Sequence, residues 1–211
     1  GKSSPALLDS FGTHLDTLMT SKDKLSKMDG AAADLCVIEN EDEFSENDIE
    51  APAGALFNIT DQKTLYSKNA NDEREIASIT KIMTAILAFK NGNMDDIVTI
   101  PAEALNQESG STEIGFQEGD QVTLDELLHG LLIYSGNDAA VAIAQHIGGS
   151  VDQFVEMMNQ EALELGATNT HFANPSGLQD ENHYTTVYDI YLMLQEAMTY
   201  PHFIWMLPIS I

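Results

Sequence analysis

Five segments with a helical spacing of apolar residues lie between residues 74 and 201, and they limit the possible folds of the chain most strongly. In the most regular of them, leucines recur at the positions of a helix that faces a core: Leu124, Leu127, Leu128, Leu131 and Leu132. Thr123 and Glu126 open this segment as a capping box. Glycines or a proline close the segments, as is typical of helix ends. The predicted helices span 74–92, 123–134, 137–149, 150–166 and 185–201.

A β-hairpin is predicted before these helices. Residues 53–59 form an apolar strand, Asp61 to Lys63 form a polar turn, and 64–68 form a second strand. Residues 93–120 are rich in Gly, Ser and Glu and are expected to be a looser region. Strands followed by many helices indicate an α+β fold.

The first 50 residues differ from the rest of the chain. Residues 1–30 are predicted to contain one amphipathic helix, and residues 39–50 carry seven acidic residues and no basic one, which indicates a solvated linker. We therefore predict an N-terminal extension over 1–50 and a compact domain over 51–211. Cys36 is the single cysteine, so no internal disulfide is possible, and we expect it to be a buried apolar residue.

The charge of the chain excludes some classes of partner. Its 211 residues include 34 acidic and 9 basic ones, a net charge of −25, and no lysine or arginine follows Lys90. Nucleic acids and anionic membrane surfaces are bound by clustered Lys and Arg, so neither is expected here. We interpret the acidity as a solvated, self-repelling surface. No apolar run approaches the roughly 18 residues of a transmembrane helix.

Ser78 and Lys81 are candidate catalytic residues. Positions i and i+3 share one face of a helix, and the surrounding residues are apolar. Burial disfavours the charged form of a lysine and lowers its pKa, so such a lysine can take a proton from a neighbouring hydroxyl. The same spacing occurs at Ser21 and Lys24 among charged residues, so the spacing alone is a weak signal.

Ser135 and Asn137 form a second candidate motif, at the break between the Leu-rich helix and the apolar helix that follows. Small polar groups there can project into a cleft. The alternative is that Asn137 or Asp138 simply caps the next helix. A pair with the same spacing, Ser45 and Asn47, lies in the acidic linker.

Taken together, "ASITKIMTA" and "LLIYSGNDAA" resemble the penicillin-binding D-alanyl-D-alanine carboxypeptidases. These belong to the wider family of serine β-lactamases and penicillin-binding enzymes, whose motifs are Ser-x-x-Lys, Ser-x-Asn and Lys-Thr-Gly. Three further segments resemble the carboxypeptidase branch, and the resemblance covers about residues 53–200: "LFNITDQKTLYSKNA", "GDQVTLDELLHGLL" and "FANPSGLQDENHYTT".

The resemblance implies a β-lactamase/DD-peptidase-like fold, in which an antiparallel sheet packs with a mostly helical lobe. It implies a serine-type carboxypeptidase that acts on peptidoglycan pentapeptide stems, binds β-lactam antibiotics and needs no metal or other cofactor. Such an enzyme works outside the cytoplasm, secreted or in the cell envelope. We expect that the signal peptide is not part of this chain, which has no start methionine.

The resemblance also implies roles for single residues. Ser78 would be the nucleophile and Lys81 the base that takes its proton. Ser135 would relay a proton to the departing D-Ala amine, and Asn137 would bind the amide region of the substrate. The N–H of Ser78, near a helix N-terminus, would contribute to the oxyanion hole. Residues 174–178 and 180–186 are assigned to the structure around the site.

The third motif of the family is missing from this sequence. The one Lys-Thr pair, Lys63 and Thr64, is followed by Leu65 and lies in the predicted hairpin. Because the segments upstream stay close to the family, we interpret this as truncation and expect the closing strands of the sheet to be missing. We therefore expect the chain by itself to be a poor carboxypeptidase.

Two other functions stay open on the sequence. A serine β-lactamase would need a glutamate to activate water, for which Glu164 is a weak candidate that we expect to be a solvated helix residue. A non-catalytic peptidoglycan-binding or regulatory homologue would keep the fold without the reaction. A metal hydrolase is not favoured, because the histidines lack ligand spacing and are expected at surfaces or helix ends: His14, His129, His146, His171, His183 and His202.

Overall fold

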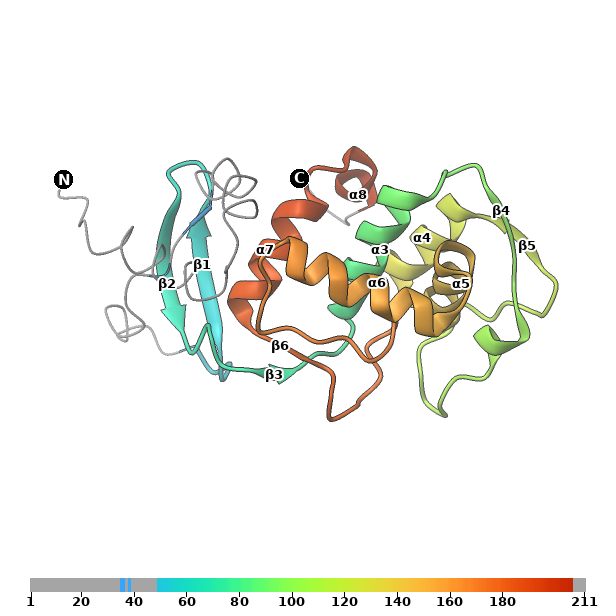
Figure 1. The fold of residues 1–211 in the computed structure, drawn as a ribbon, viewed down its shortest axis with the longest axis horizontal. Helices are drawn as coiled ribbons and strands as arrows, with labels where there is room; N and C mark the ends of the chain where they lie inside the picture. Colours follow the sequence, from blue (N-terminus) through green and yellow to red (C-terminus); the bar gives the residue numbers. More distant parts are fainter. Residues whose placement is uncertain (1–34, 37, 39–48, 207–211) are drawn as a thin grey trace. The chain divides into compact units, whose positions relative to one another are not determined.

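A computed structural model describes residues 35, 36, 38 and 49–206 of the chain (Figure 1). The chain divides into two compact units, Gly1–Asp72 and Glu73–Ile211. The helix predicted within 1–30 and nearly all of the acidic stretch lie outside the described residues. The domain boundary near residue 51 therefore stays a prediction. Cys36 is fully buried, as expected.

The described part of the first unit contains the predicted hairpin. Strands β1 (Gly54–Asn58) and β2 (Lys63–Lys68) pair antiparallel, with an irregularity in register between Leu56 and Phe57. The side chain of Asn58 accepts hydrogen bonds from the N–H groups of Thr60 and Asp61, at 3.1 and 3.0 Å, and so forms the turn. The predicted strands are confirmed to within a residue or two at their ends.

The second unit contains all the helices of the described residues. All five predicted helices are present, and a short sixth helix, α8, begins at Pro201. The sequence had suggested Pro201 as a stop, but proline is also well suited to the first position of a helix. The helices are α3 (Thr80–Asn91), α4 (Leu124–Tyr134), α5 (Asn137–Gly148), α6 (Val151–Glu164), α7 (Val187–Ala197) and α8 (Pro201–Met206).

Short strands connect distant parts of this unit. Strand β3 (Arg74–Glu75) pairs with β6 (Tyr184–Thr185), which ties the segment before α3 to the segment before α7. Strands β4 (Ile97–Thr99) and β5 (Gln121–Thr123) pair across the region predicted to be loose, which also contains the 3-10 helix η1 (Ala102–Leu105). Strands of two or three residues are too short to show a period of two, so the sequence did not predict them.

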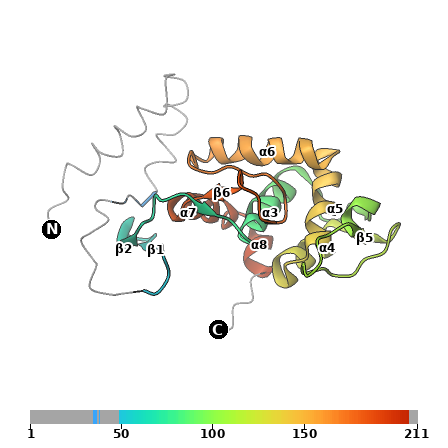
Figure 2. The same cartoon turned by 90° about the horizontal axis from the view of Figure 1, so that it is seen from below.

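Helix α5 packs against α3, α4 and α6 (Figure 2). Its alanines are completely buried and allow the neighbouring helices to approach closely. The capping box at Thr123 and the Ser150 cap are present, as predicted. Large side chains that α3, α4 and α6 bury completely are Met83, Ile86, Leu124, Leu127, Leu128, Leu131, Phe154 and Met158.

The start of α3 differs from the prediction. The helix begins at Thr80, not near residue 74, so Ser78 and Ile79 lie in the turn that precedes it. Ile79, in this turn, is 44% exposed, whereas Ile86 inside the helix is fully buried. This shift decides the geometry of the candidate site, because it places Ser78 outside the helix and Lys81 inside it.

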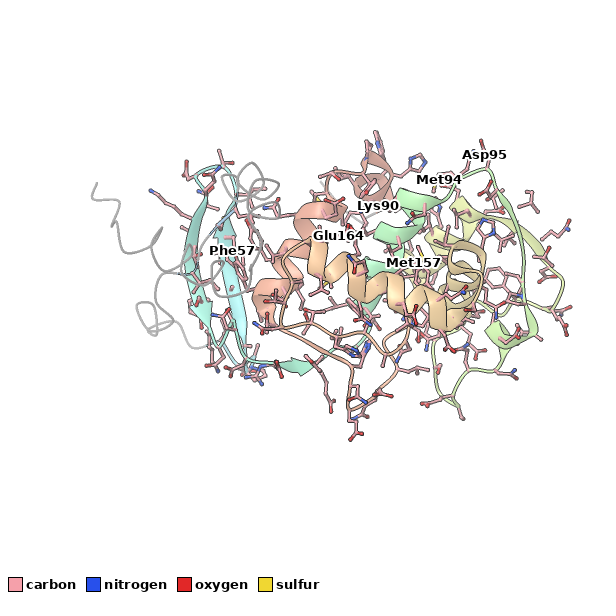
Figure 3. All side chains as sticks on the ribbon, viewed as in Figure 1. Phe57, Lys90, Met94, Asp95, Met157 and Glu164 are labelled. Atoms are coloured by element: carbon pink, nitrogen blue, oxygen red, sulfur yellow. The ribbon has the colours of Figure 1, made fainter. Side chains whose placement is uncertain are left out.

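An ion pair joins the far end of α3 to α6. The Lys90 amine lies 2.7 Å from the Glu161 carboxylate and 3.6 Å from that of Glu164. Glu161 is buried, while Glu164 and Lys90 are exposed. Figure 3 labels Lys90 on α3 and Glu164 on α6. The hydrogen bond to Glu161 raises the pKa of Lys90, so Lys90 is charged at neutral pH.

We predict that Lys90→Met destabilises the protein by about 1–3 kcal/mol, because it leaves the buried Glu161 carboxylate without its donor. Glu164→Gln removes the solvated partner of the same lysine and should change stability by less than about 0.5 kcal/mol. Urea denaturation at neutral pH measures both. Equal, small effects of the two substitutions would contradict the idea that burial of Glu161 decides the cost.

Candidate active site

Ser78 lies exposed in the turn that leads into α3. The N–H of Thr80 donates to the carbonyl of Ala77 at 3.0 Å, and the N–H of Lys81 donates to that of Ser78 at 3.1 Å. Among the described residues, the N–H of Ser78 donates no backbone hydrogen bond outside regular helices and strands. A serine in this position presents both its hydroxyl and its amide at the N-terminus of a helix, where negative charge is favoured.

Lys81 is buried, with only 4% of its surface exposed. Its amine donates to the side-chain oxygen of Asn137 at 2.8 Å and to the carbonyl of Ser176 at 2.6 Å. Burial lowers the pKa of Lys81 to about 8, the direction predicted from the sequence.

The two acceptors match the neutral form of this lysine. A neutral amine has two N–H donors and one lone pair, whereas an ammonium group has three donors and no lone pair. Asn137 and Ser176 accept the two N–H groups of the neutral amine and leave its lone pair available. The arrangement therefore suits a group that accepts a proton.

Asn137 and Ser135 occupy the break between α4 and α5. Asn137 is the first residue of α5 and is buried, while the N-cap position belongs to Gly136 and has no side-chain cap. Asn137 is therefore not the N-cap, whereas Asp138, the other residue of the capping alternative, accepts the N–H of Ala139 at 2.9 Å in the first turn of α5. Ser135 ends α4 in the left-handed conformation, with φ of 58°, which is unfavourable for a residue other than glycine. Such backbone strain tends to cluster at functional sites.

The structure joins two of the four predicted site residues directly. Lys81 and Asn137 share a hydrogen bond, although 56 residues separate them in the sequence. In the described part of the chain, neither the hydroxyl of Ser78 nor that of Ser135 is a hydrogen-bond partner of the Lys81 amine. Ser78 is tied to Lys81 through the backbone of the turn, and Ser135 lies two residues before Asn137 in the chain.

The loop Asn174–Leu178 holds the second acceptor in place. The Asn174 side-chain oxygen accepts hydrogen bonds from the N–H groups of Ser176, Gly177 and Leu178 at 2.7–3.2 Å. The Thr84 hydroxyl on α3 donates to the carbonyl of Pro175 at 2.6 Å. The sequence assigned this loop to the surroundings of the site, but not the contact of Ser176 with Lys81. A backbone carbonyl leaves no signal in the sequence.

Asp138 supports the site in a way that the sequence did not predict. Its buried carboxylate accepts a hydrogen bond from the N–H of Ile114 at 2.9 Å and another from the N–H of Gly115 at 2.9 Å. The carbonyl of Thr112 accepts the N–H of Asn137 at 2.8 Å. Asp138 therefore holds the loop 112–116 beside the Ser135–Asn137 turn. The signal in the sequence was an acidic residue in the first turn of a helix, which had only suggested a cap.

His183 corrects another prediction. All histidines were expected at surfaces or helix ends, and the described ones are exposed except for His183, which is 1% exposed.

Within the described residues, no group of three or more His, Cys, Asp or Glu side chains is arranged to hold a metal ion. The part of the chain that the structure covers also contains no helix that is long and apolar enough to cross a membrane.

Comparison with solved structures defines the class of this fold. D-alanyl-D-alanine carboxypeptidase DacD of Francisella tularensis superposes with a TM-score of 0.70 at 31% identity, over 78% of this chain and 40% of that one. Penicillin binding protein 6B of Escherichia coli gives a TM-score of 0.67 at 34% identity, over 78% and 56% of the two chains. The chain thus has the β-lactamase/DD-peptidase fold, as predicted.

Sequence comparison identifies the family. Residues 40–206 match the D-alanyl-D-alanine carboxypeptidase family, and the chain belongs to it. The carboxypeptidase DacF of Bacillus subtilis is 42% identical over 156 residues, and DacD of Escherichia coli is 36% identical over 152 residues. These alignments cover 72% and 68% of this chain but only 40% and 39% of the two relatives.

Gly177 offers a test of how tightly the loop fits against the Ser78 turn. It has φ of +95°, and an added Cβ would collide with the carbonyl of Ala77 and lie 3.0 Å from the nitrogen of Ser78. We predict that Gly177→Ala destabilises the protein by about 1–3 kcal/mol more than Gly119→Ala. Gly119 is the matched control, because it has φ of +85° but open space around it.

Urea denaturation of the two variants measures this difference. Both substitutions carry the cost of a left-handed alanine, so the excess for Gly177 isolates the collision with the turn. Equal losses for the two variants would mean that the loop can move away from Ala77 at little cost.

Proposed function

We propose that the protein is a serine-type D-Ala-D-Ala carboxypeptidase that binds penicillin, with Ser78 as nucleophile and Lys81 as its base. Membership of the family supports the reaction class. The observation that carries the assignment of residues is the buried Lys81 amine, one turn from an exposed serine, with two acceptors that match its neutral form.

In the proposed reaction, the Ser78 oxygen attacks the carbonyl carbon of the penultimate D-Ala while its proton passes to the lone pair of Lys81. The C–N bond to the terminal D-Ala then breaks, and the leaving amine takes up a proton. Water hydrolyses the resulting ester, which releases the shortened peptide and restores the Ser78 hydroxyl. The N–H of Ser78, which donates no backbone hydrogen bond to any described residue, can stabilise the oxyanion of each tetrahedral intermediate.

Asn137 and Ser135 have distinct proposed roles. The side-chain oxygen of Asn137 faces the Lys81 donor, so its NH₂ group is the part left for substrate, and we expect it to bind a carbonyl oxygen of the peptide. Ser135 lies at the adjacent strained turn, and we assign to it the relay of the proton to the leaving D-Ala amine. The peptide is a peptidoglycan stem, which puts the enzyme outside the cytoplasm.

The β-lactamase alternative gains no support from the structure. Glu164, its weak candidate for activating water, is exposed at the end of α6, where it accepts a hydrogen bond from Gln160 and pairs with Lys90. Lys90 lies nine residues beyond Lys81 on α3, which is about 13 Å along a helix axis. Glu164 is therefore held near the opposite end of α3 from Ser78.

We predict that the protein encoded by the complete reading frame forms a covalent adduct with penicillin at Ser78. Ser78→Ala should abolish the adduct, and Lys81→Met should slow its formation by about 10²–10⁴-fold, because a general base is lost. Intact-mass measurement and peptide mapping detect and locate the adduct. Ser21→Ala is the matched control at the second Ser-x-x-Lys spacing and should label normally.

Absence of any adduct would favour a non-catalytic homologue. An adduct mapped to Ser135 would overturn the assignment of the nucleophile. Release of D-Ala from a pentapeptide separates a carboxypeptidase from a β-lactamase, which would instead hydrolyse penicillin rapidly.

We also predict that the rate of acylation rises with pH, with a midpoint near pH 8. Lys81 acts as a base only when it is neutral, and burial lowers its pKa to about 8, so the neutral fraction grows as the pH rises through that value. Stopped-flow labelling with a fluorescent penicillin between about pH 6 and pH 9 measures the profile. A rate that falls with pH, or that does not change, would exclude Lys81 as the base.

A further inference from the structure

His183 is a buried imidazole that the proposed reaction does not use. Its Nε2 lies 2.7 Å from the hydroxyl oxygen of Thr80, and its Nδ1 accepts the N–H of Ala173 at 2.9 Å. Because Nδ1 is an acceptor, a neutral ring carries its proton on Nε2. His183 therefore donates to the hydroxyl of Thr80, and the backbone fixes which tautomer is present.

Thr80 connects this histidine to the candidate site. It is the first residue of α3 and lies between Ser78 and Lys81 in the sequence. Its side chain is buried, and a β-branched residue in a helix has few χ1 rotamers. A hydrogen bond that fixes the Thr80 hydroxyl consequently fixes the start of α3 and the turn before it.

His183 also holds the chain on the other side of Ser78. Its carbonyl accepts the N–H of Ile76 at 3.4 Å, and the next residues, Tyr184 and Thr185, pair with Glu75 and Arg74. The backbone of His183 thus contacts the segment that enters the Ser78 turn, while its ring contacts the residue that leaves it. The two contacts bracket the nucleophile.

We propose that His183 is a positioning residue, which holds the Ser78 turn in its reactive geometry by donating a hydrogen bond from Nε2 to the hydroxyl of Thr80. The inference rests on the proposed function, since it concerns the nucleophile assigned there. His183 does not exchange protons with the substrate and acts through Thr80.

The surroundings keep the ring neutral. Burial is the main cause that lowers the pKa of His183, to about 4; the nearby charge of Asp180 opposes this shift and His171 adds to it. The Phe172 ring packs against the imidazole in a T-shaped arrangement, with a centroid distance of 5.8 Å. A second proton would have to sit on Nδ1, facing the N–H of Ala173, so the hydrogen-bond pattern itself excludes the charged form.

Two substitutions of His183 separate its two hydrogen bonds. Glutamine can place an N–H donor where Nε2 lies, whereas asparagine reaches only the position of Nδ1 and cannot reach Thr80. Thr80→Val removes the hydroxyl and keeps the shape of the side chain. We expect His183→Gln to be acylated by penicillin within about threefold of wild type, and His183→Asn and Thr80→Val to be slower by about 10–100-fold.

The double variant Thr80→Val/His183→Asn tests whether the two residues act as one unit. It should be no slower than either single variant, because both remove the same hydrogen bond. Urea denaturation of each variant is measured in parallel, and Thr80→Val decides the question if His183→Asn does not fold. Nitrogen NMR of the wild-type protein should show His183 protonated on Nε2 at neutral pH, independently of any reaction.

The outcomes are distinguishable. If the wild-type protein is not labelled at Ser78, the proposed function fails and this inference with it. If labelling is normal and Thr80→Val is acylated at the wild-type rate, the proposed function stands and the positioning role is overturned. Equal losses in His183→Gln and His183→Asn, in step with their stability, would also overturn it.

Discussion

The hydrogen bonds of the buried Lys81 amine are the interaction on which the rest of the site depends. They join α3 to the first residue of α5, Asn137, which is 56 residues from Lys81 in the sequence. They also join α3 to the loop that contains Ser176, 95 residues from Lys81. Burial makes the charged form of the lysine costly, and the two acceptors satisfy the neutral form. The same contacts therefore assemble the site and set the pKa of its base.

Two lysines on α3, Lys81 and Lys90, have opposite pKa shifts because their surroundings differ. Lys81 is buried against neutral acceptors, and its pKa is lowered; Lys90 is half exposed beside two carboxylates, and its pKa is raised. The first lysine is suited to accept a proton, and the second is suited to join two helices. The hydrogen bonds of Lys81 thus fix one end of α3, and the ion pairs of Lys90 fix the other end.

The contrast between Ser78 and Lys81 follows from where α3 begins. Because the helix starts at Thr80, the serine is exposed in a turn and the lysine is inside the core. A turn of this kind needs support from outside the helix. The segment 173–185 supplies it through Ser176, through the close approach of Gly177 and through both the ring and the backbone of His183.

Local patterns in the sequence were sufficient to predict most of the helices and the hairpin. The helical spacing of apolar residues predicted α3 to α7, the polar turn predicted the hairpin, and the two motifs pointed to Ser78, Lys81, Ser135 and Asn137. The sequence did not predict the start of α3 at Thr80, the short strand pairs, the burial of His183 or the carbonyl of Ser176. These features depend on contacts between distant segments, and neither a backbone carbonyl nor a three-residue strand leaves a periodic signal. Residues 173–185 lie against the first turn of α3 only in the folded protein. The buried hydrogen bonds between them form only when a donor and an acceptor that are far apart in the sequence meet.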